Sequence, residues 1–110
     1  MKLFLDTSTP ETILRLDNKE YHHTFANDLA EQLLEFIHAK LAENKKSFTD
    51  ITEITFMSGP GSFTGLRIGA SIVNTIATEL NVPLYDHHGH QYPIIIPEYG
   101  RPANISTPRK

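Results

Sequence analysis

The chain has 110 residues, a formal net charge of −3 and no cysteine. This length allows one domain with a modest core, and the lack of thiols excludes disulfides, a cysteine nucleophile and a thiolate metal site. A net negative charge gives no electrostatic footprint for nucleic acid. The apolar run before Asp6 is too short for a signal peptide, and no segment approaches transmembrane length, so we expect a cytoplasmic protein without a membrane contact.

Three strands are predicted at the start of the chain, at residues 2–6, 12–16 and 19–24. Asp17-Asn18 is a turn signal between the second and third strands. Such short connections favour an antiparallel meander.

Two helices and two further strands are predicted next. Apolar residues recur at three-four spacing from Ala26 to Leu41, which indicates one face of a helix. A strand at 53–57, a helix rich in small residues at 66–80 and a fifth strand at 82–86 follow. The order of elements indicates an α/β domain over residues 1–90.

The segment 91–110 is rich in proline and predicted to be a tail, disordered in part over residues 103–110. Within it, Ile94-Ile95-Ile96 is interpreted either as a short edge strand or as a segment docked on the core.

A glycine-rich turn lies between the fourth strand and the second helix. Such a turn directs backbone N–H groups and a helix dipole at one point, which suits an anion. The alternative is a tight turn that binds nothing, since the run fits neither the Walker pattern nor the dinucleotide pattern. The candidate site residues of this turn are Gly59, Pro60, Gly61, Ser62, Thr64 and Arg67.

The run from Gly59 to Gly69 resembles the signature of the TsaB (YeaZ) family, glycoprotease-like proteins of the actin/Hsp70/sugar-kinase superfamily. Residues 3–9 resemble the opening strand and turn of that family, and residues 81–84 resemble its link from helix to strand. The resemblance covers residues 1–86. It implies a ribonuclease-H-like fold with a five-stranded mixed sheet and two main helices, and a minimal or truncated member with only the N-terminal domain.

The same resemblance assigns Asp6, Thr7 and Ser8 to a first phosphate loop, where the carboxylate works with Mg²⁺. The alternative for these residues is an Asx or Ser/Thr turn. Because an ATPase of this class needs loops from a second domain, we expect no autonomous catalysis and no cofactor, with ATP or ADP and Mg²⁺ only at a joint site shared with a partner.

A second candidate site is the histidine cluster His87, His88 and His90. Imidazoles this close along a chain can share Zn²⁺, Ni²⁺ or Fe²⁺. Solvated loop histidines are the favoured interpretation, with Asp86 pointing elsewhere. His22 and His23 are expected on opposite faces of a strand.

The resemblance implies a non-catalytic subunit that supports a TsaD-type enzyme, with a TsaE-type ATPase, in making threonylcarbamoyladenosine on tRNAs that read ANN codons. It implies a homodimer as well, and only indirect contact with tRNA. The alternatives are a small autonomous nucleotide- or metal-binding protein and a structural homodimer without a partner. The residues expected at the dimer or partner interface are Leu29, Leu33, Phe36, Ile37, Leu66, Gly69, Ile72, Val73 and Ile76.

Overall fold

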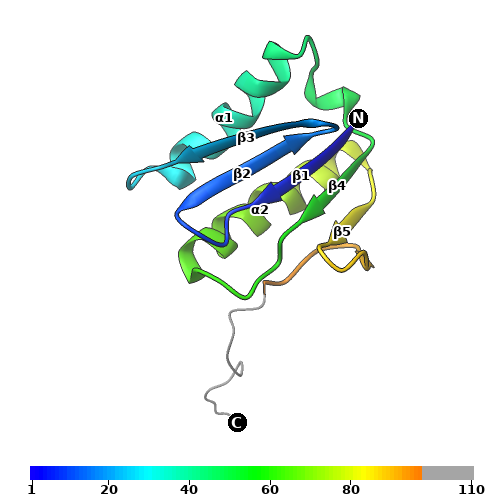
Figure 1. The fold of residues 1–110 in the computed structure, drawn as a ribbon. Coiled ribbons are helices and arrows are strands. Elements are labelled where there is room, and N and C mark those ends of the chain that lie inside the picture. Colours follow the sequence, from blue (N-terminus) through cyan, green and yellow to red (C-terminus); the bar gives the residue numbers. More distant parts are fainter. Residues whose placement is uncertain (98–110) are drawn as a thin grey trace.

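The computed structural model describes residues 1–97. It contains a six-stranded sheet with strand order β3-β2-β1-β4-β5-β6 (Figure 1). The strands are β1 (Lys2–Asp6), β2 (Glu11–Leu16), β3 (Lys19–Thr24), β4 (Glu53–Phe56), β5 (Leu84–Asp86) and β6 (Gln91–Tyr92). β1, β4 and β5 run parallel to one another, and the other pairings are antiparallel.

β1 lies inside the sheet, with both of its edges paired and with alternate residues buried. Leu3 and Leu5 point into the core, opposite Leu16 and Leu14 of β2 in the antiparallel register. On its other side, β1 pairs with β4. The predicted meander β1-β2-β3 is confirmed, with Asp17 in the left-handed conformation at the β2–β3 turn.

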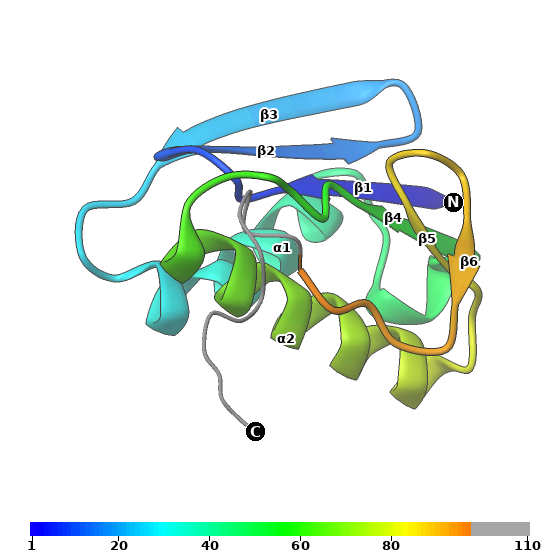
Figure 2. The same cartoon turned by 90° about the horizontal axis from the view of Figure 1, so that it is seen from below.

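Both helices, α1 (Leu29–Glu43) and α2 (Phe63–Leu80), cover the same face of the sheet (Figure 2). α2 starts at Phe63, three residues before the predicted start, because the Ser62 hydroxyl accepts a hydrogen bond from the Gly65 N–H at 3.3 Å. It ends with the C-cap residue Asn81, which has a left-handed backbone (φ 56°).

α1 starts later than predicted, at Leu29. The apolar spacing begins at Ala26, but residues 26–28 form the connection from β3, and Asp28 is the N-cap. Its buried residues, Leu33, Ile37 and Leu41, form a single stripe at four-residue spacing. A short helical turn, η1 (Phe48–Asp50), then leads to β4.

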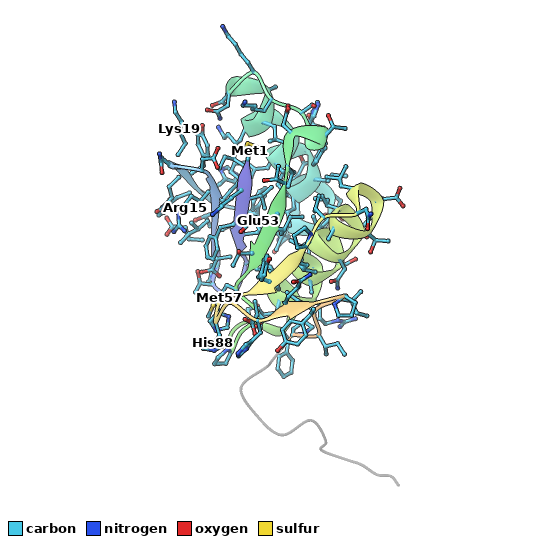
Figure 3. All side chains as sticks on the ribbon, turned by 90° about the vertical axis from the view of Figure 1, so that its right-hand side faces the viewer. Met1, Arg15, Lys19, Glu53, Met57 and His88 are labelled. Atoms are coloured by element: carbon cyan, nitrogen blue, oxygen red, sulfur yellow. The ribbon has the colours of Figure 1, made fainter. Side chains whose placement is uncertain are left out.

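Among residues 1–97, no helix covers the opposite face of the sheet. Figure 3 shows the sheet from its side, with the helices to the right and Arg15 to the left. Phe4, Ile13, Thr55 and Tyr85 alternate with core residues along their strands and are half-buried on this open face. The Arg15 guanidinium lies 4.6 Å from the centre of the Phe4 ring.

The prediction of five strands is wrong by one, because β6 pairs with β5 through a short hairpin. Two residues are too few to show a period of two, so the sequence pattern gave no signal for this strand. Gly89 in the hairpin has φ 86°, which glycine adopts without strain.

After β6 the chain returns along α2. Ile95 is buried, and its backbone forms two hydrogen bonds with the Asn74 side chain, at 2.8 and 3.0 Å. Of the two interpretations of Ile94–Ile96, docking on the core is therefore confirmed and an edge strand is wrong. The predicted disorder at residues 103–110 lies outside the described residues.

Candidate functional site

Two segments meet at the carboxyl ends of β1 and β4, and we call them the loop pair: residues 6–9 and residues 58–62. The Ser62 N–H donates to the Ser8 carbonyl at 2.9 Å. The Thr7 hydroxyl, which is buried, donates to the Gly65 carbonyl in the first turn of α2 at 2.6 Å. The sequence-predicted phosphate loop and the glycine-rich turn are therefore brought together.

The glycines of the turn permit this contact. A Cβ atom on Gly61 would lie 2.6 Å from the Ser8 side chain, and one on Gly65 would overlap the Thr7 carbonyl. Further along α2, a Cβ atom on Gly69 would overlap the Thr7 hydroxyl and lie 2.6 Å from the Phe56 ring. The close approach that these small residues allow is thus to the chain's own first loop. The assignment of Gly69 to a partner interface is wrong for this reason.

Asp6 forms the Asx turn that was the alternative interpretation. Its Oδ1 accepts hydrogen bonds from the Ser8 amide at 2.8 Å and from the Ser8 hydroxyl at 2.6 Å. Because Thr7 points into α2 and Ser8 points back to Asp6, neither hydroxyl is directed at an external phosphate. These residues by themselves fit Mg²⁺ and a phosphate poorly. Asp6 is the one carboxylate of the loop pair, and only its second oxygen is free to bind a metal ion.

Arg67 and Thr64 face a different region. They line an open groove of about 320 Å³ between the starts of α1 and α2, which we call the helix groove; its lining residues are Ala30, Thr64, Arg67, Ile68, Ser71 and Ile72. None of the residues of the loop pair lines it. Arg67 is exposed, and its side chain forms no ion pair or hydrogen bond with any residue between 1 and 97. Arg67 therefore lies away from the loop pair, whereas Thr64 also borders a neighbouring cavity that Ser62 lines.

Most of the residues predicted at an interface are in the core of the single chain. Six of the nine are buried: Leu33, Ile37, Leu66, Gly69, Val73 and Ile76. Their assignment to a dimer or partner interface is wrong, because the sheet already covers them. Leu29, Phe36 and Ile72 are partly exposed.

Sequence reasoning missed the apolar residues that do reach the surface. Leu34 is 46% exposed and Phe63 is 41% exposed, while Ala30 and Ile68 border the helix groove. Ala30 and Leu34 are one turn apart on α1, beside the buried stripe rather than on it. The apolar band of α1 is wider than the stripe that packs on the sheet, and this extra width is the sequence signal for exposed apolar residues.

The histidine cluster is held by hydrogen bonds. The Asp86 Oδ1 accepts from the amides of His88 and His90 at 2.9 Å each, and Nδ1 of His90 lies 3.6 Å from the Asp86 Oδ2. Asp86 thus lies against the cluster, whereas it was expected to point elsewhere. His87 Nδ1 accepts from the Ser58 amide at 3.3 Å. Among residues 1–97, no three potential ligands come together in a geometry that would hold a metal.

Burial raises the pKa of Asp86, but the hydrogen bonds from the His90 and His88 amides outweigh it and hold that pKa below its usual value. The carboxylate is therefore ionised at neutral pH. On β3, His22 and His23 lie on opposite faces as predicted. His22 contacts Glu20 and Glu11, and His23 packs against Phe25 and Phe36.

The mixed sheet with two helices on one face is the ribonuclease-H-like fold of actin-like proteins. YeaZ from Pseudomonas aeruginosa superposes with a TM-score of 0.67 at 29% identity, over 77% of this chain and 42% of that one. A second solved structure, titled as similar to peptidase YeaZ from Pseudomonas aeruginosa, gives a TM-score of 0.68 over 77% of this chain and 41% of its own.

Sequence comparison agrees with the fold. The profile described as "TsaD: tRNA N6-adenosine threonylcarbamoyltransferase" matches residues 20–94. The tRNA threonylcarbamoyladenosine biosynthesis protein TsaB of Haemophilus influenzae is 33% identical over 74% of this chain and 36% of its own length. The corresponding protein of Escherichia coli is 29% identical over 74% and 37%. The chain belongs to the TsaB (YeaZ) family, as its signature indicated.

The chain spans less than half the length of the curated relatives it matches. Within the described residues, neither helix has the length and apolar character needed to cross a membrane.

Proposed function

We propose that the chain is a non-catalytic partner of a TsaD-type enzyme in the biosynthesis of threonylcarbamoyladenosine on tRNAs that read ANN codons. Membership of the TsaB family supports the process, since the relatives are named for it. The structural observation that supports the role of a partner is the helix groove. It combines the apolar residues Ala30, Ile68 and Ile72 with Arg67, whose side chain has no ion-pair partner in residues 1–97.

The chemistry of the helix groove suits a protein partner. Ile68 and Ile72 of α2 face Ala30 of α1, and exposed Leu34 lies one turn further along α1. Apolar side chains at such spacing on two packed helices accept the apolar face of another helix. Arg67 at the rim then favours a partner that presents a carboxylate there.

The same surface suits a second copy of the chain in the absence of the enzyme. Glu31 and Glu35 on the exposed side of α1 form no ion pair within residues 1–97. In a twofold arrangement, either one is a counterpart for Arg67 of the other copy. We propose that homodimer and enzyme complex compete for this groove.

ATP or ADP and Mg²⁺ enter the proposal only at a joint site. The loop pair offers the second oxygen of Asp6, because the other oxygen is engaged by Ser8. Further ligands must come from the TsaD-type subunit or the TsaE-type ATPase. In this proposal the chain positions its partners and contacts tRNA only through them.

The test is calorimetric titration of the purified chain with the TsaD-type subunit of the same organism. Ile72→Asp places a charge in the helix groove and should weaken the complex by at least about tenfold, because a charge loses most of its hydration when it is buried. Thr78→Asp, an exposed position on the same helix that borders a different cavity, is the matched control. Equal affinity for both variants and the unchanged chain would overturn the role of the groove.

A further inference from the structure

A second cavity lies at the carboxyl ends of β4 and β5, where it shares Ser58 with the loop pair and no residue with the helix groove. Its volume is about 360 Å³. Ser58, Asp86, His88 and His90 form a polar wall, and residues 94–96 form an apolar wall. Ligand sites of open α/β sheets form at the carboxyl ends of the strands, and this volume lies within the range for small molecules.

The Asp86 carboxylate is the chemical centre of this cavity. It is only 6% exposed, and the two amide hydrogen bonds both go to Oδ1. Oδ2 has no hydrogen bond from residues 1–97, since Nδ1 of His90 lies 3.6 Å away. Buried polar atoms are nearly always satisfied, so a buried, ionised oxygen at a cavity requires a donor from outside.

The apolar wall limits what that donor can be. Ile94 is 54% exposed and Ile96 is 80% exposed, and both face the cavity that Asp86 borders. A metal ion fits poorly, because the described residues bring no three ligands together. A cation on an aliphatic stem satisfies both walls, with its charge at Asp86 and its methylene groups against the isoleucines.

We propose that this cavity binds alkylammonium or alkylguanidinium groups, either of a free small molecule or of a lysine or arginine side chain in a peptide. The charge-assisted hydrogen bond to Asp86 Oδ2 determines the preference for a cation. Contact with Ile94 and Ile96 determines the preference for an aliphatic stem.

The test is an NMR titration of the isotope-labelled full chain with n-butylguanidinium, n-butylammonium and the neutral 1-butanol. We expect saturable shifts at the amides of His88 and His90 with both cations, and binding of butanol at least about tenfold weaker, since an ionic hydrogen bond is about twice as strong as a neutral one. A short peptide with one arginine between alanines is the last arm. Tighter binding of the peptide than of butylguanidinium identifies a side chain as the ligand, and the reverse identifies a small molecule.

Asp86→Asn keeps an oxygen for the two amide bonds and removes the charge, so binding of the cations should fall by about tenfold or more. Asp17→Asn is the matched control, because Asp17 also accepts an amide hydrogen bond, from Lys2 at 2.9 Å, but lies in another cavity. If Asp86→Asn does not fold, Ile96→Ser at an exposed position takes its place and should weaken binding several-fold. Shifts that do not saturate, equal affinity for butanol, or full affinity in the folded variants would each overturn the proposal.

Discussion

Gly69 is enclosed between the first loop and the central sheet. A Cβ atom there would overlap the Thr7 hydroxyl and approach the Phe56 ring to 2.6 Å. We expect Gly69→Ala to lower the free energy of unfolding by about 1–3 kcal/mol, because overpacking forces the strand and helix apart. Urea denaturation monitored by circular dichroism measures this loss.

Thr75→Ala, on the exposed side of the same helix, is the control for helix propensity. An unchanged midpoint for Gly69→Ala would mean that α2 can move away from Thr7 without cost. The close packing of the loop pair would then not be a requirement of the fold.

His22 links two acidic residues on the open face of the sheet, Glu20 at 2.6 Å and Glu11 at 3.3 Å. The hydrogen bond to Glu20 raises the pKa of His22, and the contact with Glu11 adds to it. The folded chain therefore binds this proton more tightly than the unfolded chain. The stabilisation is complete below the usual histidine pKa of about 6.5 and is lost as the pH rises through the raised value.

We expect His22→Gln to be less stable than the unchanged chain at pH 5.5, with the difference shrinking as the pH rises towards 8.5. The effect is small because all three side chains are exposed. Chemical denaturation across this pH range measures it, with His38→Gln on α1 as the control. A difference that grows with pH would contradict the assigned direction.

At the scale of elements, Asn74 ties the segment after β6 to α2. Its side chain makes both hydrogen bonds to the backbone of Ile95. We expect Asn74→Ala to speed amide exchange at Ile95 by about thirtyfold, because each of the two lost hydrogen bonds is worth about 1 kcal/mol. Hydrogen exchange followed by NMR measures the change, and amides of β1 serve as the internal reference.

The elements that the sequence predicted best have local signals. The Asp17-Asn18 turn between β2 and β3 depends on the preference of these neighbouring residues alone. β6 was missed because its pairing with β5 comes from a hairpin that carries only two strand residues.

The candidate site was harder to predict because it depends on contacts between distant segments. Three-four spacing selected Leu33, Ile37 and Val73 for an interface, yet the same spacing marks the stripe that faces the sheet. Similarly, Gly69 on α2 signals close approach, but the sequence does not say to what. Only the fold shows that Thr7 is the neighbour.

At the scale of the whole molecule, a change at Arg67 is expected to affect binding of the partner but not the stability of the fold. Arg67 contributes no ion pair within residues 1–97, so Arg67→Ala should shift the melting temperature by less than about 4 °C, because surface changes usually stay within about 0.5 kcal/mol. Affinity for the TsaD-type subunit should fall by about tenfold.

The control for this change is Arg15→Ala, which removes the pair with Glu20 on the opposite side of the molecule. For each variant, calorimetric titration measures the affinity for the TsaD-type subunit and a thermal melt measures the melting temperature. If Arg67→Ala unfolds the chain, Arg67 is a structural residue and its proposed part in the complex is wrong.

The central place of β1 has a consequence for synthesis on the ribosome. β1 is made first, but its parallel neighbour β4 ends at Phe56, and Thr7 bonds to Gly65. At roughly 5–20 residues per second, several seconds pass before these segments exist. During that time the nascent chain contains β1, β2, β3 and α1, and one side of β1 is an open edge prone to wrong pairing. Emergence of α2 from the ribosome, rather than completion of any strand, is the event that encloses the first loop.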